Sequence, residues 1–251
     1  MGAVTQVSVG DFHTCVIGDA HQVRCFGTNS NGELGYGNTE PIGDDEPALV
    51  AGDVEVGGPV IQLAAGSGFT CALLEGGAVR CWGTGSARLG HGNTDAIGDD
   101  ETPASAGDLD LGGPAIQIAA GSQHACAVLV GGALRCWGNG SHGALGYGNE
   151  DDIGDDETPA SAGDVDVGGP VAEVTIGSSH TCARLTTGAM RCWGFGGDSF
   201  GNDGVLGRGV FGSIGDDETP GSIPPVDVGA TVRDLAAATT TTCAVTTAGK
   251  V

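Results

Sequence analysis

The sequence predicts an all-β repeat array, and three observations support this fold class. Glycine supplies 49 of the 251 residues and aromatic side chains only 4%, which disfavours helical bundles because a glycine inside a helix costs about 1 kcal/mol relative to alanine. Apolar residues alternate in short runs that are broken by Gly and Pro, as in strands. A unit of roughly 56 residues also recurs along the chain, marked by Cys15, Cys71, Cys126, Cys182 and Cys243.

The expected units cover residues 1–57, 58–112, 113–168 and 169–228, with a partial unit at 229–251. In the third unit we expect four strands with Gly131-Gly132 as a hairpin turn; the strands are Ala115–Ala120, Ala125–Val130, Ala133–Trp137 and Asp164–Val167. A four-stranded unit of this size cannot bury its faces alone. Neighbouring units must therefore stack, either radially as the blades of a β-propeller or linearly as a solenoid.

Several positions of the unit together resemble a known repeat. The third unit contains GSQHACAVLVGGALRCWGNGSHGALGYG, which recurs as GDFHTCVIGDAHQVRCFGTNSNGELGYG from Gly10 and as GSSHTCARLTTGAMRCWG from Gly177. This pattern resembles the repeat of the regulator of chromosome condensation family, in the form of a bacterial-type secreted variant with paired cysteines. The resemblance covers the whole chain and implies a β-propeller, typically one of seven blades.

The number of units predicts an incomplete or open propeller, with about four four-stranded blades plus an extra half unit. If each blade combines the late strand of one unit with the early strands of the next, residues from about 27 to 251 supply four blades and the first 26 residues form a half blade. Both ends then carry the same half and cannot complete each other. We therefore expect open strand edges that another chain can meet.

Eight of the nine cysteines form pairs whose members are ten residues apart: Cys15 and Cys25, Cys71 and Cys81, Cys126 and Cys136, and Cys182 and Cys192. A hairpin turn between the members places them opposite each other, with Cβ atoms about 4.5 to 5.5 Å apart, which favours disulfides. Reduced core thiols are one alternative. Zinc is another, but pairs in different blades do not converge on one ion. Cys243 is expected to be unpaired, and four disulfides imply an extracellular, cell-surface or periplasmic location.

A second recurrent feature is the acidic loop Ile-Gly-Asp-Asp-Glu, which occurs in four units. Carboxylate and amide oxygens are the ligands that calcium prefers, so calcium is the candidate cofactor, although Ala104 stands where a calcium loop requires a bidentate Glu. We favour the alternative of a solvated loop whose charge keeps a glycine-rich β protein from aggregating. The candidate calcium ligands are Asp44, Asp45, Glu46, Asn93, Asp95, Asp99, Asp100, Glu101, Asn149, Asp151, Asp155, Asp156, Glu157, Asp216, Asp217 and Glu218.

Other recurrent residues are interpreted as structural. A histidine two residues before a cysteine recurs at one position of the unit, and we expect packing or hydrogen bonding there rather than catalysis; these residues are His13, His124 and His180, with Phe69 and Thr241 in the other units. A tryptophan that follows a cysteine is expected in the blade core, at Trp82, Trp137 and Trp193. The arginines beside them are expected to pair with carboxylates such as Asp44 or Asp99.

The fourth unit contains a loop, after Trp193, that is five residues longer than its counterparts. Insertions in one unit of a repeat protein often map to a binding surface, so the loop is a candidate ligand site. Its candidate binding residues are Phe195, Asp198, Phe200 and Asn202. Drift in a tolerant loop is the alternative explanation.

The composition and the repeat together favour a secreted or surface, non-catalytic binding module whose partner is a protein or a glycan. A net charge of -23 repels nucleic acid, and the chain contains no apolar run of about 18 residues that would insert into a membrane. The first alternative is a structural protein that assembles into oligomers or fibres through its open blade edges. The second is a regulator resembling a guanine nucleotide exchange factor, which only the family name implies.

Overall fold

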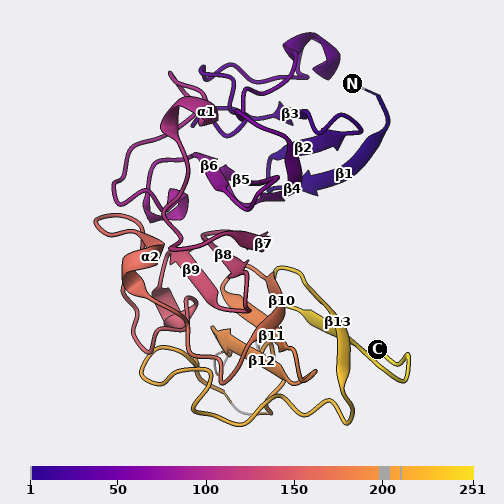
Figure 1. The fold of residues 1–251 in the computed structure, drawn as a ribbon, viewed down its shortest axis with the longest axis vertical. Helices are drawn as coiled ribbons and strands as arrows, with labels where there is room; N and C mark the ends of the chain where they lie inside the picture. Colours follow the sequence, from indigo (N-terminus) through magenta and orange to yellow (C-terminus); the bar gives the residue numbers. More distant parts are fainter. Residues whose placement is uncertain (1, 198–203, 210) are drawn as a thin grey trace.

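The computed structural model describes residues 2–197, 204–209 and 211–251, and its strands form five antiparallel sheets (Figure 1). The first three sheets are β1 (Val4–Val9), β2 (His13–Gly18) and β3 (Val23–Gly27); β4 (Val60–Ala65), β5 (Phe69–Leu74) and β6 (Val79–Gly83); and β7 (Ala115–Ala120), β8 (His124–Leu129) and β9 (Leu134–Gly138). The last two are β10 (Val171–Ile176), β11 (His180–Leu185) and β12 (Met190–Gly194), and the two-stranded β13 (Val232–Ala237) and β14 (Thr242–Thr246). The all-β prediction is confirmed.

Only short helices interrupt the loops between the sheets. They are η1 (Ala48–Ala51), η2 (Ala87–Leu89), α1 (Pro103–Ala106), η3 (Ser141–Gly143) and α2 (Pro159–Ala162). None of those within the described ranges has the length and hydropathy that a bilayer span requires.

Within each of the first four sheets, the second and third strands form a tight hairpin. In the third sheet the turn contains Gly131 and Gly132, whose φ angles of 95° and 88° are strained for residues with a side chain. The turn fixes the register, so that His124 lies opposite Gly138 and Cys126 opposite Cys136. Every residue of the middle strand β8 is buried, because β7 and β9 flank its two edges and β10 of the next sheet packs against it.

The expected fourth strand is reduced to a single backbone contact. In the third sheet, Val165 N donates to Leu134 O at 2.9 Å, and Val54 pairs in the same way with Val23. The aspartates of this segment instead use their carboxylates locally: Asp166 accepts from Gly168 N at 3.0 Å, and Asp164 pairs with Arg135. The segment thus packs its apolar side chains on the sheet without extending the strand ladder.

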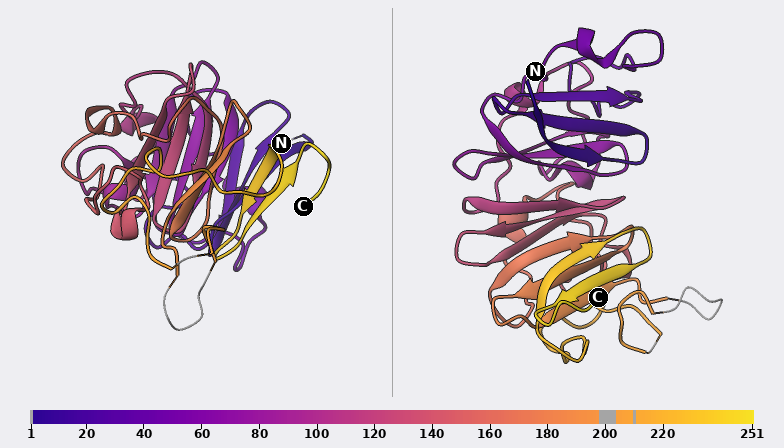
Figure 2. Two further views of the ribbon diagram at one scale, coloured as in Figure 1. Left: turned by 90° about the horizontal axis from the view of Figure 1, so that it is seen from below. Right: turned by 90° about the vertical axis from the view of Figure 1, so that its right-hand side faces the viewer.

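The first four sheets follow one another in chain order along the longest axis of the molecule, and the last sheet lies beside the fourth, at the end away from the first sheet (Figures 1 and 2). The inner strand of each sheet contacts the inner strand of the next, from β1 to β4, β7, β10 and β13. The sheets are the blades of an open propeller.

The expected assembly of blades from two successive units was wrong. Residues 4–27 form a complete three-stranded sheet by themselves, and the two-stranded sheet lies at the C-terminal end. The late segment of each unit bonds to the third strand of its own sheet, as Val54 does to Val23 and Val165 to Leu134, and does not join the early strands of the next unit.

Candidate binding surfaces and the joints between blades

A glutamine on the inner strand clamps each of the first three blades to the next. Gln62 Nε2 donates to Ile118 O at 2.8 Å, while Ile118 N donates to Gln62 Oε1 at 2.9 Å. The same reciprocal pair joins Gln6 to Leu63 and Gln117 to Val174. In the fourth blade Glu173 accepts from Leu235 N at 3.4 Å, and its carboxylate has no N–H with which to complete the clamp. The sequence interpretation missed this clamp, although glutamine recurs at one position in three units.

A second joint runs through the recurrent histidines. His124 Nε2 lies 2.8 Å from Thr181 Oγ1 of the next blade, and Thr181 Oγ1 donates to Ala144 O at 3.0 Å. The hydroxyl therefore accepts from the Nε2–H of a neutral imidazole. His13 pairs with Thr70 and His180 with Thr242 in the same way. These contacts confirm the expected packing and hydrogen-bonding role of the three histidines.

The joint between the second and third blades uses a different pair. Phe69 occupies the histidine position and is fully buried, and Ala125 replaces the threonine in the following blade. The histidine and threonine are thus exchanged together for two apolar residues. This internal substitution indicates that the joint requires matched partners and does not require a histidine in particular.

Burial determines the protonation of these histidines. It lowers the pKa of His124 to about 3, with a smaller effect from neighbouring His180, and it lowers the pKa of His180 to about 4. The pKa of His13 is also lowered, mainly by burial and against the raising effect of Glu33 and Asp11. These imidazoles are neutral at pH 7 and suit a structural joint.

The structure contains the four expected disulfides. The bridges join Cys15 to Cys25, Cys71 to Cys81, Cys126 to Cys136 and Cys182 to Cys192, with Cα atoms 4.0 to 4.1 Å apart. All eight cysteines are buried between neighbouring strands of one hairpin. Cys243 is free and exposed on β14.

The arginines beside the third-strand cysteines have partners other than those expected. Arg80 Nε lies 2.7 Å from Asp108 Oδ1; Arg24 pairs likewise with Asp53, and Arg135 with Asp164. The acidic loops supply none of these partners, so the expectation of Asp44 or Asp99 was wrong. The aspartate that begins the reduced fourth segment lies beside the third strand. These aspartates are largely exposed, which makes each pair a weak contributor to stability.

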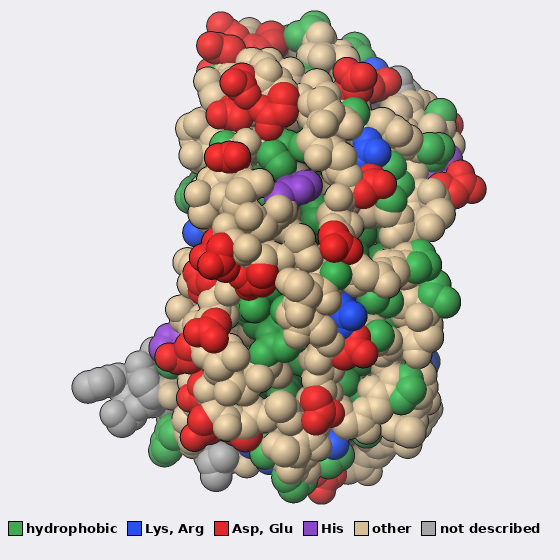
Figure 3. Space-filling view, turned by 60° about the vertical axis from the view of Figure 1, so that its left-hand side comes forward, with side chains coloured by type: hydrophobic (Ala, Val, Ile, Leu, Met, Phe, Trp, Pro, Cys, Tyr) green, Lys and Arg blue, Asp and Glu red, His purple; other side chains and the backbone are tan. Residues whose placement is uncertain are grey.

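The four acidic loops each bring three carboxylates together, with ligand atoms within 4.8 Å of one another; the groups are Asp44, Asp45 and Glu46; Asp99, Asp100 and Glu101; Asp155, Asp156 and Glu157; and Asp216, Asp217 and Glu218. Figure 3 shows acidic side chains in separate groups along one side of the molecule. The loops also join blades, because Gly37 N, Gly92 N and Gly148 N donate to the carbonyls of Gly98, Gly154 and Gly215 at 3.0 Å.

Crowding within the acidic loops disfavours full ionisation. Partial burial, followed by the hydrogen bond to Asp156 and the charges of Asp156 and Asp155, raises the pKa of Glu157 to about 7. The pKa values of Glu101 and Glu218 are raised for the same reasons. Of the other candidate ligands, Asn93 and Asn149 use their side-chain oxygens to accept from the backbone N–H of Asp95 and Asp151 at 3.0 and 3.1 Å. A calcium site therefore stays a prediction for the four triplets.

Calcium and a chelator are both expected to leave the melting temperature unchanged, because the solvated-loop interpretation requires no ion. Glu157→Gln is expected to raise the melting temperature at pH 8, where Glu157 is ionised beside Asp155 and Asp156, and to have little effect at pH 5. Differential scanning fluorimetry at both pH values measures this. A calcium-dependent rise that Glu157→Gln abolishes would contradict the solvated-loop interpretation and establish a metal site.

The candidate binding loop of the fourth blade is described only in part. Phe195 is half-buried, and its ring centroid lies 5.0 Å from that of His142 in the preceding blade. Asp198, Phe200 and Asn202 lie outside the described residues. For Phe195, the structure favours a contact between blades over an exposed ligand contact.

The first blade presents an uncovered apolar face. Val7 on β1 is 57% exposed, whereas the equivalent Leu63 on β4 is 2% exposed because the preceding blade packs over it. Val4, Val9 and Phe12 are exposed beside Val7. We refer to Val4, Val7, Val9 and Phe12 as the N-terminal apolar face. Its residues follow the same strand pattern as the later units, so the sequence alone did not distinguish it.

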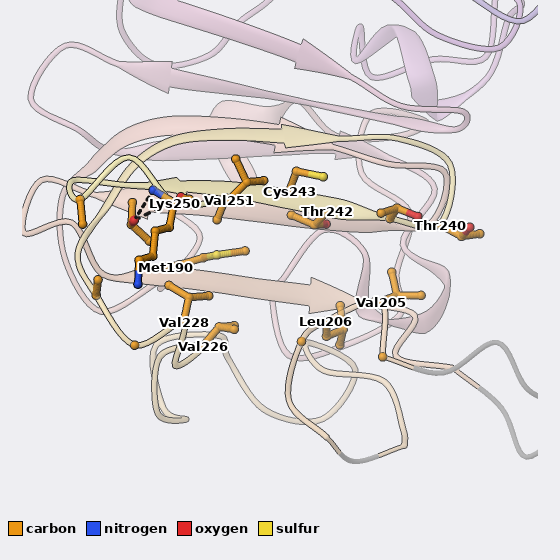
Figure 4. A pocket seen from close by; sticks show the side chains of 18 residues that line it. Met190, Val205, Leu206, Val226, Val228, Thr240, Thr242, Cys243, Lys250 and Val251 are labelled. Atoms are coloured by element: carbon orange, nitrogen blue, oxygen red, sulfur yellow. Dashed lines mark hydrogen bonds between the residues drawn. The ribbon is translucent and has the colours of Figure 1, made fainter.

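The last blade borders a groove of about 920 Å³. Figure 4 shows Thr242 and Cys243 of β14 on one side and Met190, Leu206 and Val226 of the fourth unit on the other. We refer to this space as the β14 groove. It lies along the edge of β14 that is not paired with β13.

Comparison with known proteins identifies relatives of this repeat. A family described as the regulator of chromosome condensation (RCC1) repeat matches residues 4–33, 60–87, 115–144 and 171–201, and a second family of the same description matches residues 21–73 and 132–184. The E3 ubiquitin-protein ligase HERC2 of Homo sapiens is 30% identical over 189 residues, which cover 73% of this chain and 4% of that protein.

Two solved structures share the fold. Prp20p from Saccharomyces cerevisiae has a TM-score of 0.70 at 17% identity, covering 95% of this chain and 54% of Prp20p. The ectodomain of the Arabidopsis thaliana receptor kinase ACR4 has a TM-score of 0.52 at 22% identity, covering 97% of this chain and 59% of that one. The chain therefore spans a small part of HERC2 and somewhat more than half of each of the two solved chains.

Proposed function

Because the chain belongs to the regulator of chromosome condensation (RCC1) repeat family, we propose that it is a non-catalytic protein-binding module that works outside the cytosol. The N-terminal apolar face is the observation that carries the binding role. Clustered apolar side chains at a surface mark interaction sites more often than scattered ones do. The apolar chemistry favours a protein partner over a glycan.

The four buried disulfides support the extracellular, cell-surface or periplasmic location. Disulfides persist in oxidising compartments and are rare where glutathione and thioredoxin keep thiols reduced. The similar fold of the ACR4 ectodomain is compatible with such a location. Prp20p, whose structure is described together with its binding to Gsp1p and histones, is an example of this fold with protein partners.

Nucleotide exchange on a GTPase is not part of the proposal. Fold does not determine function, and an exchange factor that works at chromatin would contact DNA. A net charge of -23 opposes that contact.

Assembly of the chain with itself is the second candidate function. The same N-terminal apolar face favours it, because within the chain every equivalent face is covered by another blade of the same repeat. A second copy would supply such a blade at its C-terminal end. The two functions therefore predict different partners for one surface.

Val7→Asp is expected to abolish binding through the N-terminal apolar face, while Val130→Asp, at an exposed valine near the tip of a hairpin, serves as the matched control. Beads carrying each variant are compared with wild type for the proteins that they retain from extracellular material. A protein retained by wild type and Val130→Asp but lost with Val7→Asp supports the binding module. Retention that is equal on all three would refute it.

Sedimentation velocity at increasing protein concentration separates the second function from the first. A simple binder keeps a constant sedimentation coefficient. A protein that assembles shows a rising coefficient, which Val7→Asp returns to the monomer value and Val130→Asp does not. Fibres or rings in electron micrographs of the concentrated wild type would likewise favour assembly.

A further inference from the structure

We propose that a cavity at the joint between the third and fourth blades binds one neutral sugar unit. The cavity has a volume of about 220 Å³, and its lining includes Ala144, His124 and His142 of the third blade and Ser178 and Ser179 of the fourth. We refer to it as the Ala144 cavity. It differs in place and in chemistry from the N-terminal apolar face, so it goes beyond the proposed function.

An alanine opens the cavity. One position of the unit, directly before a buried leucine, differs from blade to blade; its residues are Glu33, Arg88 and Ala144. Glu33 is 3% exposed, and its carboxylate accepts from Thr28 Oγ1 at 3.1 Å and from Asn31 N at 2.8 Å. The equivalents of Thr28 and Asn31 are Asn139 and His142, which both line the cavity. In the third blade, alanine therefore leaves open the space that the glutamate side chain fills in the first.

A buried histidine supplies a hydrogen-bond acceptor in the lining. His124 is 1% exposed, and its Nε2–H donates to Thr181 Oγ1 at 2.8 Å. The neutral imidazole then has a lone pair at Nδ1, for which the described part of the chain supplies no partner. A buried acceptor without a partner is unfavourable. Because His124 lines the cavity, a ligand hydroxyl that donates to Nδ1 would satisfy it.

A second histidine stands at the rim in a strained conformation. His142 has a φ angle of 60°, in the left-handed region that disfavours residues with a side chain. Such conformations cluster at ligand sites. The ring of His142 rests against that of Phe195, with 5.0 Å between the centroids, and it forms no hydrogen bond to any described residue. The imidazole is thus held in place with its nitrogens available to a ligand.

The fourth blade contributes hydroxyl groups on a fixed turn. Ser178 and Ser179 are half-buried, and neither hydroxyl has a hydrogen-bond partner within the described ranges. Their backbone is held, because Ser178 N donates to Thr239 O at 3.0 Å and Phe195 N donates to Ser179 O at 2.8 Å. A ligand that bridges the two blades would therefore meet polar groups that are already positioned, which lowers the entropy cost of binding.

The chemistry of the lining selects a neutral, hydroxyl-rich ligand. The described lining side chains include amides, hydroxyls and imidazoles and carry no carboxylate, ammonium or guanidinium group. Amides and hydroxyls both donate and accept hydrogen bonds, as sugar hydroxyls do. Glu150 Oε1 accepts from His142 N at 2.8 Å and Asp152 Oδ1 from Asn139 Nδ2 at 3.2 Å, so nearby carboxylates disfavour an anionic ligand.

The size of the cavity limits the ligand to about one sugar ring. Its volume of about 220 Å³ lies below the range of about 300 to 1,000 Å³ that is usual for pockets holding drug-sized ligands. One unit of a glycan, or a free monosaccharide, presents the hydroxyls that the lining requires within such a space. The cavity therefore fits a single neutral sugar unit.

The test titrates the methyl glycosides of glucose, galactose, mannose and N-acetylglucosamine, as both anomers, into the protein, with glucuronic acid as the anionic control. Saturation-transfer difference spectra detect binding. We expect at least one neutral glycoside to bind with a dissociation constant on the order of 1 mM, since a ligand of so few atoms gains little affinity, and glucuronic acid not to bind. If no neutral glycoside binds, or if glucuronic acid binds as well as the neutral ones, the proposal is wrong.

Comparison of the bound methyl glycoside with the corresponding free sugar identifies the source of the ligand. A preference for the glycoside assigns the cavity to the end of a glycan. A preference for the free sugar assigns it to a monosaccharide. Both results support the cavity.

Ala144→Glu restores the glutamate of the first blade and should fill the cavity. We expect this variant to keep the melting temperature of wild type, because Glu33 occupies the equivalent space, and to lose sugar binding. Val130→Glu adds the same charge at an exposed valine and is the matched control, which should bind as wild type does. Binding that survives Ala144→Glu would place the sugar elsewhere on the molecule and refute the proposal.

His142→Gly tests the rim without endangering the fold. Glycine adopts the left-handed conformation readily, so the melting temperature should equal or exceed that of wild type. Loss of the imidazole should weaken sugar binding by about fivefold, the effect of one hydrogen bond. Unchanged affinity in this variant would contradict the assigned rim.

Nitrogen-15 spectra of the histidine-labelled protein report on the base of the cavity. The Nδ1 resonance of His124 should move as the glycoside is added. The Nδ1 atom of His13 is buried without a partner in the first blade, where Glu33 fills the equivalent space, so its resonance should stay in place. A His124 resonance that does not move at saturating glycoside would overturn the proposal.

Discussion

Trp137→Ala is expected to lower the free energy of unfolding by about 3 to 5 kcal/mol, the range for removal of a large buried aromatic side chain. Trp137 is fully buried, and a Cβ atom built on Gly90 of the preceding blade would lie 2.8 Å from Trp137 Cδ1. The indole fills the joint between the second and third blades. A smaller side chain would leave a cavity there, because the backbone at Gly90 cannot move into the space without shifting its own loop. Urea unfolding without reductant measures the change.

Trp137→Phe and Trp193→Phe separate the hydrogen bond from the volume of the ring. Trp137 Nε1 donates to Arg88 O at 3.0 Å, whereas the buried Trp193 Nε1 has no partner among the described residues. Trp137→Phe therefore leaves a buried carbonyl with one partner fewer, and we expect it to cost about 1 kcal/mol more than Trp193→Phe. A loss below about 1 kcal/mol for Trp137→Ala would show that the blades do not depend on this contact.

The parts of the fold that the sequence predicts are those with short-range signals. The hairpin around Gly131 and Gly132, the disulfide between Cys126 and Cys136 and the burial of Trp137 all follow from residues within one unit. The reduced fourth segment escaped prediction because its alternating pattern is that of a strand. The carboxylates of Asp164 and Asp166 decide the outcome, since they bond to Arg135 and to the following turn.

The joints between blades were harder to predict, because each links residues that lie roughly 56 positions apart. The arginine partners illustrate this: composition offered many carboxylates, and only the placement of the segment before Leu109 selects Asp108 for Arg80. The exposure of the candidate surfaces likewise depends on contacts between blades. Val7 carries the strand pattern of Leu63, and its exposure depends on which sheets pack against β1. The sequence did contain one signal of the histidine joint, since Phe69 and Ala125 together replace the histidine and the threonine.

The replacement of the histidine and threonine pair by Phe69 and Ala125 leads to the second large prediction. His124→Phe alone is expected to lower the free energy of unfolding by about 2 kcal/mol at pH 7.5, because Thr181 loses the imidazole donor and a larger ring must fit beside it. His124→Phe combined with Thr181→Ala reproduces the pair found at Phe69 and Ala125. The double variant should recover most of the loss, to within about 1 kcal/mol of wild type.

The pH dependence of the free energy of unfolding further distinguishes wild type from the double variant. The folded pKa of His124 is about 3 and the unfolded pKa is 6.5, so the unfolded chain alone takes up the proton between these values. The stability that His124 contributes is present above pH 6.5 and is lost as the pH falls toward 3. At pH 5 the free energy of unfolding falls by about 2 kcal/mol for one such histidine. The lowered pKa of neighbouring His180 changes the free energy of unfolding in the same direction.

The carboxylate of Glu157 opposes this trend, because its folded pKa of about 7 lies above the unfolded value of 4.5 and stability rises as it is protonated. Wild type and the double variant share Glu157, so the difference between their unfolding free energies isolates the histidine. We expect the double variant to be the more stable of the two at pH 5 by about 1 to 2 kcal/mol, in urea unfolding measured from pH 7.5 to 4.5. If the unfolding free energies of wild type and the double variant changed in parallel with pH, the histidine would take up a proton without opening the joint. That result would contradict the assigned neutral imidazole.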